Sequence, residues 1–441
     1  MGLHDRTRPC KARAPVLELW FDFSCPYAYL ASQQASRLAA RGVEIDWRPM
    51  LLGGVFRGIG AGDGPMATLS APKARHNAAD MHRWAEVIGA PFRLPDTHPM
   101  RTVRALRVLL GLPHREWPAA IHALYATYWQ RAEDITHDAV IRAALATAGI
   151  DTNIIDGAFA TADSDAIKNE LRARTDEAIA LGVFGAPAWI VRRESAPLLI
   201  WGQDRITWVE AVLAGWDPDR DPPPGGARTV DATPAASGAT LDVYFDVSSP
   251  FAYLGLTQLP ALARATGVTP RLVPILLGAL FKDLQQANVP WFAMPVAKQR
   301  YLGVEMSRWA HWWGQPFVFP KKFPQRTVNA QRLAILAAEQ SFESGVQLAI
   351  ALGRAMWAEQ RDLEDTATLA QIIAETQSSD AWITGITEPE VKARLAENTA
   401  SAKAAGVFGV PTFVVNGRHL FWGQDRMGLV ARALAGWSPA Y

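Results

Sequence analysis

Residues 17–30 read L-E-L-W-F-D-F-S-C-P-Y-A-Y-L, and residues 241–254 repeat the pattern as L-D-V-Y-F-D-V-S-S-P-F-A-Y-L. Each stretch is a short apolar strand followed by a proline that suits the first position of a helix. The residue before this proline is Cys25 in the first copy and Ser249 in the second. Both side chains are expected at a helix N-terminus, where free backbone N–H groups stabilise anions.

The rest of the chain keeps the register of this repeat. G-V-F-G-x-P ends at Pro187 and at Pro411, 224 residues apart, which is also the spacing of the two opening stretches. W-G-Q-D-R recurs at 201–205 and 422–426. Repetition over this length predicts two copies of one domain.

The length of 441 residues also suits two domains better than one core. We read 1–15 as a disordered tail, because it is basic but lacks the apolar core of a secretory signal. Pro, Gly and small polar residues mark 217–240 as an interdomain linker. The predicted domains are 16–216 and 241–441.

Composition argues against several classes of partner. The net charge of +1 gives no electrostatic reason to expect nucleic acid, and no apolar run is long enough to cross a membrane. Two cysteines, Cys10 and Cys25, make no disulfide framework, which favours the cytoplasm. Cys10 lies in the tail and is expected to be incidental.

Each copy shows the same order of elements, and the fold class is α/β. Strand, helix and strand come first, a long helical stretch follows, and a hairpin and a last helix close the copy, with Asn416-Gly417 as a tight turn in the second. This is a thioredoxin-like layout with a helical insertion. The expected elements are strands 17–23 and 241–247, helices 26–40 and 250–265, strands 43–49 and 269–275, helical stretches 66–180 and 291–405, hairpins 188–201 and 412–422, and helices 206–215 and 427–436.

Cys25 and Ser249 are the candidate catalytic residues. A helix N-terminus lowers the pKa of a thiol, so we expect Cys25 to be a reactive thiolate; the alternative is a buried, inert cysteine. Ser249 either donates a hydrogen bond to a bound anion or serves as an ordinary N-cap.

Two further motifs suggest a peptide-like ligand. In a thioredoxin-like domain the corresponding proline is often cis and faces the N-terminus of the first helix. Because Pro187 and Pro411 recur in register with the opening stretches, we expect both to be cis, so that the backbone of Ala186 and Val410 pairs with the ligand. In W-G-Q-D-R, an Asp and an Arg either hold an ammonium and a carboxylate or cap the next helix. These residues are Asp204 and Arg205 in the first copy, and Asp425 and Arg426 in the second.

The helical insertions also align. K-A-R-H-N-A-A-D-M-H-R-W-A and K-Q-R-Y-L-G-V-E-M-S-R-W-A begin at Lys73 and Lys298, which either contact a ligand or lie on a solvated face. Arg101–Thr102 and Arg326–Thr327 are expected to open a helix near the cleft. No metal site is predicted.

Taken together, D-F-S-C-P-Y-A-Y-L, the lysine motif, G-V-F-G-x-P and W-G-Q-D-R resemble the 2-hydroxychromene-2-carboxylate isomerase and kappa-class glutathione transferase family, which has the DsbA-type thioredoxin fold. The resemblance spans 17–216 and 241–437, and the second copy is the closer match. It implies that the chain binds glutathione in the cytoplasm. Family members are single-repeat dimers, so this fusion is expected to be a monomer with an internal pseudo-dimer.

The resemblance also implies roles for individual residues. Ser249 would position the glutathione sulfur, and Lys298 would lie near the glycyl carboxylate. The backbone at Val410 and Pro411 would hold the tripeptide, and Asp425–Arg426 would hold its γ-glutamyl end. The matching positions of the first copy are Cys25, Ala186, Pro187, Asp204, Arg205 and Lys73.

The function predicted from these features is that of a glutathione-dependent isomerase or transferase acting on an aromatic electrophile. Cys25 departs from the family serine, and the run C-P-Y-A has no second, resolving cysteine. One alternative is therefore a single-cysteine thiol–disulfide oxidoreductase that uses Cys25 and glutathione. Another is a binding scaffold without catalytic activity.

Overall fold

The computed structural model describes residues 16–440 except 63, 65, 67, 68, 194 and 288. The predicted tail at 1–15, including Cys10, lies outside the described residues. Packing divides the chain into two compact units. One contains the residues up to Gly62 together with Val87–Gly215, and the other contains Asp63–Glu86 together with Trp216–Tyr441.

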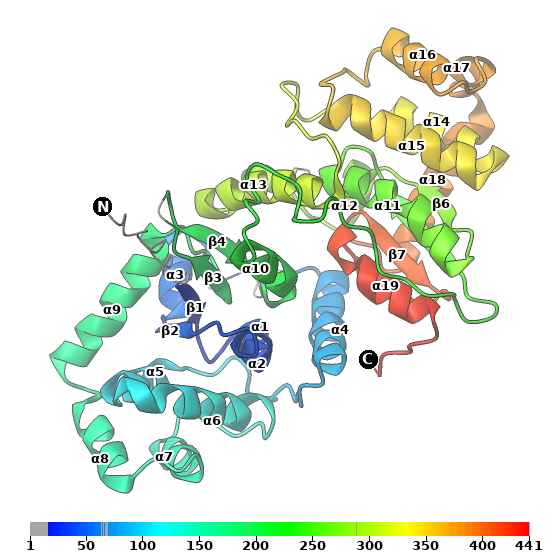
Figure 1. Ribbon diagram of the computed structural model, residues 1–441. Coiled ribbons are helices and arrows are strands. Elements are labelled where there is room, and N and C mark those ends of the chain that lie inside the picture. The colour runs from blue at the N-terminus through cyan, green and yellow to red at the C-terminus, as the bar shows by residue number, and fades with distance from the viewer. Residues whose placement is uncertain are drawn as a thin grey trace, which may run out of the picture. The chain divides into compact units, whose positions relative to one another are not determined.

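The first unit is built on a four-stranded sheet with the strand order β2-β1-β3-β4 (Figure 1). β1 runs parallel to β2 and antiparallel to β3, and β3 and β4 form the hairpin. All five residues of β1 are buried, which is why the strand reads as a continuous apolar run. The elements are β1 (Leu17–Phe21), α1 (Pro26–Gln33), α2 (Ala35–Ala39), β2 (Ile45–Pro49), α3 (Leu52–Gly58), α5 (Val103–Gly111), η2 (His114–Glu116), α6 (Trp117–Trp129), α7 (Asp138–Thr147), α8 (Thr152–Thr161), α9 (Asp165–Ala180), β3 (Ala188–Val191), β4 (Leu198–Trp201), η3 (Gln203–Arg205) and α10 (Ile206–Leu213).

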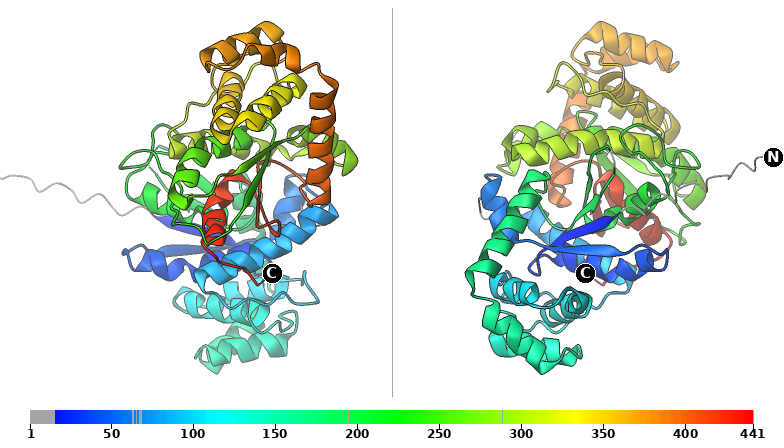
Figure 2. Two further views of the ribbon diagram at one scale, coloured as in Figure 1. Left: turned by 90° about the vertical axis from the view of Figure 1, so that its right-hand side faces the viewer. Right: turned by 60° about the vertical axis from the view of Figure 1, so that its left-hand side comes forward.

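The second unit repeats this sheet as β6-β5-β7-β8, with the same parallel and antiparallel pairs. Its helices α14–α17 lie together on one side of the sheet, yellow to orange in Figure 2, and α18 leads back from them to β6 and α12. The elements are α4 (Ala71–Ile88), β5 (Leu241–Phe245), α11 (Pro250–Thr266), β6 (Arg271–Pro274), α12 (Leu277–Asp283), η4 (Pro290–Ala293), α13 (Val296–Trp313), α14 (Val328–Gln340), α15 (Phe342–Trp357), α16 (Thr366–Glu375), α17 (Ala381–Gly385), α18 (Pro389–Ala404), β7 (Thr412–Val415), β8 (His419–Trp422), η5 (Gln424–Arg426) and α19 (Met427–Leu434).

The predicted α/β fold with two thioredoxin-like domains is confirmed, with small differences at the ends of elements. The predicted first helix, 26–40, is interrupted at Gln34 and forms α1 and α2, whereas its counterpart α11 is continuous. The second hairpin turns at Asn416 and Gly417, whose φ angles of 54° and 63° suit a tight two-residue turn.

Helix α4 belongs to the first copy in the sequence but to the second unit in the structure. All but its last two residues belong to the second unit, where the helix packs against β8 and η5 (Figure 1). Arg83 donates to the carbonyl of Leu420, and the Nε atom of Arg426 donates 2.9 Å to Asp80. The second unit therefore contains α4, from the first copy, as well as α13, which is the counterpart of α4 in the second copy.

The segment 217–240 is tied to the second unit as well. Arg308 of α13 forms a 2.7 Å ion pair with Asp219, and Arg228 donates its amide to the carbonyl of Trp312. Further along, Ala236 donates its amide to Leu434 of α19. These contacts place the segment along the surface of the second unit.

Candidate functional site

Cys25 lies where the sequence places it, at the N-cap of α1 and directly before Pro26. Its thiol donates a 3.1 Å hydrogen bond to the carbonyl oxygen of Ala186, and the side chain is 6% exposed. The peptide bond between Ala186 and Pro187 is cis, as predicted. The helix N-terminus and the proline loop therefore face each other, although 161 residues separate them in the chain.

The predicted low pKa of Cys25 is wrong. Burial raises the pKa of this thiol to about 12, because a thiolate loses its hydration there. Hydrogen bonds from the Ala28 and Tyr27 amides act in the opposite direction, and the negative charge of Asp22 raises the pKa further. The helix N-terminus would lower the pKa of the thiol, but the loss of hydration on burial raises it by more.

Ser249 is the counterpart of Cys25 at the N-cap of α11. Its hydroxyl oxygen accepts a hydrogen bond from the amide of Ala252 at 3.3 Å, so the N-cap interpretation is confirmed. The same hydroxyl donates to the carbonyl oxygen of Val410 at 3.3 Å, next to the cis peptide bond with Pro411. Ser249 thus combines a capping role with a place opposite the proline loop.

The peptide backbone beside Pro411 suits a ligand. Within the described residues, the amide N–H of Val410 donates to no protein group. Val410 is 7% exposed, and an unused donor in such a place is costly unless a ligand or water accepts its bond. The expected pairing of this backbone with a peptide-like ligand remains a prediction.

A buried aspartate behind each nucleophile position was not among the predicted residues. Asp22 accepts hydrogen bonds from the amides of Ser24 and Leu52 and from the hydroxyl of Thr102 at 2.5 Å. Burial raises the pKa of Asp22, and these hydrogen bonds offset part of the rise. The signal was present in the sequence, since F-D-x-S occurs in both copies.

The second copy builds the same arrangement around Asp246. Its carboxylate accepts from the amides of Ser248 and Leu277, at 2.9 Å each, and from Thr327 at 2.7 Å. Burial raises its pKa too. Thr327 and its counterpart Thr102 do stand at helix starts, as predicted, and each side chain is directed to the buried aspartate.

In the second W-G-Q-D-R, Arg426 contacts two carboxylates. Its Nε and Nη2 atoms bind the carboxylate of Asp80 on α4 at 2.9 and 3.0 Å, and its Nη1 atom lies 3.0 Å from Asp425. Gly423 has a φ of 105°, and a Cβ atom at this position would collide with the Asp425 carboxylate. The glycine therefore allows Asp425 to fold back over the turn.

The first W-G-Q-D-R repeats the turn and the neighbouring ion pair. Gly202 has a φ of 108°, and the Nη1 atom of Arg205 lies 2.8 Å from Asp204. The side chains of Asp204 and Arg205 are 12% and 9% exposed. A role in ligand binding remains a prediction for both motifs.

The structure places Lys73 with the second copy instead of the first, because it lies on α4. Its Nζ atom lies 5.0 Å from the centre of the Trp422 ring. Burial, then the positive charge of Lys298, lowers the pKa of Lys73. Burial also lowers the pKa of Lys298, while Glu305 opposes the shift. Both predicted lysines therefore lie in the unit that contains Ser249.

His76, one turn after Lys73 on α4, is a further residue that the sequence did not point out. Its Nε2 atom accepts a 3.2 Å hydrogen bond from the amide of Trp422, and its ring packs edge-on against Phe408 and Trp422. Burial lowers the pKa of His76 to about 4. Phe408 belongs to the proline motif and Trp422 to W-G-Q-D-R, so α4 joins the two motifs.

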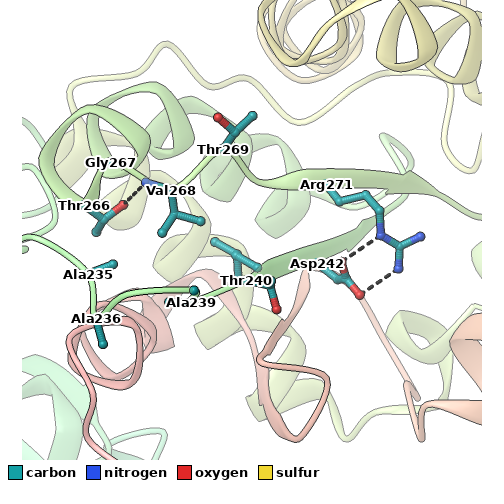
Figure 3. A pocket seen from close by; sticks show the side chains of 12 residues that line it. Ala235, Ala236, Ala239, Thr240, Asp242, Thr266, Gly267, Val268, Thr269 and Arg271 are labelled. Atoms are coloured by element: carbon teal, nitrogen blue, oxygen red, sulfur yellow. Dashed lines mark hydrogen bonds and ion pairs between the residues drawn. The ribbon is translucent and has the colours of Figure 1, made fainter.

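A cavity of about 550 Å³ lies elsewhere on the second unit (Figure 3). Thr240, Asp242 and Arg271 line it, together with the end of α11, and Arg271 pairs with Asp242 at 2.7 Å. It lies at the start of β5, whereas Ser249 follows the end of that strand. None of the predicted site residues lines this cavity.

Two negative results concern the described residues alone. In that part of the chain, His, Cys, Asp and Glu side chains form no group that could hold a metal ion. Within the same residues, every helix is too short or too polar to cross a lipid bilayer.

Comparison with known families agrees with the repeat. The family model described as a DSBA-like thioredoxin domain matches residues 16–214 and again 240–435.

Among curated proteins, the 2-hydroxychromene-2-carboxylate isomerase of Pseudomonas putida is 32% identical over 197 residues, which are 44% of this chain and 93% of the relative. The isomerase of Pseudomonas sp. (strain C18) is 30% identical over 199 residues, or 44% of this chain and 90% of the relative. Glutathione S-transferase kappa 1 of Rattus norvegicus is 27% identical over 206 residues, with the same coverage as the strain C18 enzyme. A solved 2-hydroxychromene-2-carboxylate isomerase gives a TM-score of 0.40 at 25% identity, covering 44% of this chain and 93% of that one.

Proposed function

Since both copies of this chain belong to the DSBA-like thioredoxin domain family, we propose that it is a glutathione-dependent isomerase or transferase of the cytoplasm. The reacting site is that of the second copy, and the substrate is an aromatic electrophile. One observation carries the proposal: the Ser249 hydroxyl, at a helix N-terminus, lies 3.3 Å from the carbonyl of Val410, whose own amide has no acceptor among the described residues. A hydroxyl donor beside a free backbone donor suits a cysteinyl group.

The residues around Ser249 fit the other parts of glutathione. Lys73 forms no ion pair within the described residues, and burial lowers its pKa. A carboxylate beside Lys73 and Lys298 would relieve the repulsion between their two positive charges. Asp425 supplies a negative charge for the γ-glutamyl ammonium, and Arg426, 3.0 Å away, orients the Asp425 carboxylate. In this assignment Lys73, from the first copy, contributes to the second site.

When bound, glutathione would supply a thiolate that adds reversibly to an electrophilic carbon, permits rotation about the bond thereby weakened, and leaves again. The protein's share of the chemistry is to lower the thiol pKa and to hold the sulfur in place. The Ser249 hydroxyl would turn from the Val410 carbonyl to donate to the sulfur, and the positive end of the α11 dipole would favour the negative charge of the thiolate. No proton or electron is consumed overall in the isomerisation.

The curated relatives support the proposed class of enzyme. Two isomerases and a kappa-class glutathione transferase each align over at least 90% of their own length with about one copy of this chain. The raised pKa of the Cys25 thiol weighs against the alternative of thiol–disulfide exchange at this residue, because exchange needs the thiolate.

The test is calorimetric titration with reduced glutathione, followed by mass spectrometry after incubation with oxidised glutathione. We expect the wild type to bind reduced glutathione, with an affinity that Ser249→Ala weakens and Cys25→Ser leaves unchanged. Oxidised glutathione should form no stable adduct with the protein. A stable adduct on Cys25 would instead establish the oxidoreductase. If glutathione neither binds nor forms an adduct, the remaining alternative is a binding scaffold that has no catalytic activity.

A further inference from the structure

One surface of the second unit exposes four large apolar side chains, and we call it the apolar face. It consists of Phe292, Val296, Val318 and Phe319, whose exposed fractions lie between 38% and 64%. Among the residues that the structure describes, no other phenylalanine is exposed. Soluble proteins rarely expose a contiguous group of such residues unless the group binds something. The apolar face is therefore a candidate interaction surface.

Contacts between η4 and the loop that joins α13 to α14 make the apolar face one surface. The ring centroid of Trp291 in η4 lies 5.6 Å from that of Phe319, and the centroid of Phe292 lies 6.4 Å from that of Phe323. The side-chain amide of Gln299 donates a 2.9 Å hydrogen bond to the carbonyl of Trp291, so the start of α13 also packs against η4. The exposed residues thus belong to segments that contact one another.

The apolar face carries positive charge as well. Lys321 and Arg300 are exposed, and neither forms an ion pair within the described residues. Arg300 lies one turn after Val296 on α13, so the two side chains share a side of the helix. The two stretches that form the face, 289–304 and 314–327, contain no acidic residue. Apolar and basic groups are therefore combined on one surface.

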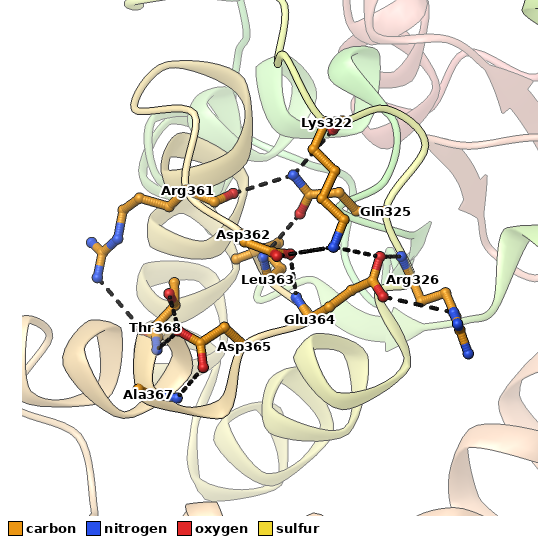
Figure 4. A network of polar contacts seen from close by, with 10 residues as sticks. All are labelled: Lys322, Gln325, Arg326, Arg361, Asp362, Leu363, Glu364, Asp365, Ala367 and Thr368. Carbon is orange, nitrogen blue, oxygen red and sulfur yellow. Dashed lines mark hydrogen bonds and ion pairs between the residues drawn. The ribbon is translucent and has the colours of Figure 1, made fainter.

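A polar network anchors the loop between α13 and α14 (Figure 4). Lys322 lies 2.9 Å from Asp362 and 3.2 Å from Glu364, and the amide of Arg326 donates to Glu364 at 3.1 Å. Figure 4 shows Lys322 directed between these two carboxylates. The loop is therefore tied to the segment before α16, and the apolar side chains that it exposes are held in place.

The first copy lacks this combination at the positions that the repeat makes equivalent. Phe292, Val296, Val318 and Lys321 correspond to Ala67, Ala71, Arg93 and Asp96. These four positions of the second copy are exposed, so packing of the core does not account for the difference. Larger apolar side chains and a positive charge occur together in the copy that has the apolar face, which indicates that both serve the same contact.

We propose that the apolar face docks the second unit onto the surface of a lipid bilayer that contains anionic lipids. Its phenylalanine and valine side chains enter the boundary between headgroups and acyl chains, and Lys321 and Arg300 contact lipid phosphates. Lysine beside the exposed rings favours a bilayer over a protein partner, because lysine is depleted from protein–protein interfaces. The net charge of the whole chain is only +1, so the attraction has to come from this face. The proposal does not depend on the proposed function.

The experiment is co-sedimentation of the full chain with vesicles of phosphatidylcholine and phosphatidylglycerol in equal parts, and with vesicles of phosphatidylcholine alone. We expect the wild type to bind the mixed vesicles more tightly, and less tightly when the salt is raised from about 0.1 M to about 0.5 M. Phe292→Ala/Phe319→Leu should lower the affinity about tenfold, because less apolar surface is buried. Lys321→Asp, which introduces the residue of the first copy, should lower it about tenfold for the mixed vesicles alone.

Leu94→Ala is the matched control, because Leu94 is the exposed counterpart of Phe319 in the first copy. It should leave vesicle binding unchanged, and circular dichroism should show that all variants keep the fold. The proposal is overturned if the wild type does not bind the mixed vesicles, if it binds both vesicles equally, or if the double variant binds like the wild type. Light scattering that finds a dimer of the wild type and a monomer of the double variant, without vesicle binding, would show instead that the face joins two copies of the chain.

Discussion

The thiol of Cys25 donates a 3.1 Å hydrogen bond to the carbonyl oxygen of Ala186, the residue before a cis proline. Ser249 and Val410 repeat this contact in the second copy at 3.3 Å. The same geometry thus holds a thiol in one copy and a hydroxyl in the other. Because a neutral thiol can donate this bond and a thiolate cannot, the contact favours the protonated form of Cys25.

The first prediction concerns the reactivity of Cys25. Burial raises its pKa to about 12, so alkylation by iodoacetamide should still increase with pH above pH 9. The measurement is the alkylation rate against pH in a Cys10→Ser background, which leaves Cys25 as the remaining cysteine. In the same background, Asp22→Asn should increase the rate at a given pH, because it removes a negative charge that disfavours the thiolate. A rate that levels off below pH 8.5 would contradict the raised pKa.

A second prediction concerns the double role of Ser249. Ser249→Ala removes the cap on the Ala252 amide and should lower the free energy of unfolding by about 1 kcal/mol. It should also raise the KM for glutathione, as the donor to the sulfur is lost. Ser249→Thr keeps both the cap and the donor, so restored glutathione affinity in that variant would separate the hydrogen bond from stability. If Ser249→Ala binds glutathione like the wild type, the hydroxyl has no place in the site.

The third prediction compares two arginine–aspartate pairs of similar geometry but different burial. Arg426→Ala leaves the carboxylate of Asp80, whose side chain is 3% exposed, without its partner and should cost about 3–5 kcal/mol of stability. Arg271→Ala breaks the pair with Asp242 at the surface and should cost under about 1 kcal/mol. Denaturant unfolding of the full chain measures both. Equal losses in the two variants would show that burial does not strengthen the dependence of Asp80 on its partner.

The fourth prediction concerns pH and His76. Its pKa is lowered to about 4 in the folded protein, against an ordinary value of 6.5, so the unfolded chain binds the extra proton first as the pH falls. Stability is therefore full above about pH 6.5 and decreases towards pH 4, by at most about 1.4 kcal/mol per pH unit. His76→Gln should flatten this slope, because Gln can still accept the Trp422 amide. The groups whose charges act on the ring are Asp80 and Asp425, which raise its pKa, and Arg426 and Arg83, which lower it.

The control for this experiment is Val304→Ala, at an exposed position of α13 without a titratable group. It should leave the slope of stability against pH as in the wild type. An unchanged slope in His76→Gln would show that the Trp422 contact does not depend on the protonation of this ring.

Much of the fold is readable from the sequence, for reasons that are local. A strand such as β1 is a continuous apolar run, Pro26 and Pro250 start helices, and Asn416-Gly417 supports two positive φ angles. Repetition in register then placed Cys25 and Ser249 opposite the two prolines. These features depend on neighbours along the chain or on the repeat, both of which the sequence displays.

Tertiary structure alone decided the electrostatics of Cys25 and the placement of α4. A helix start favours a thiolate, yet the pKa is raised, because desolvation depends on atoms brought in from distant parts of the chain. The sequence of α4 aligns with that of α13, and nothing along the chain says which sheet it joins. That choice came from partners outside its own copy, the Arg426 guanidinium for Asp80 and the Trp422 amide for His76.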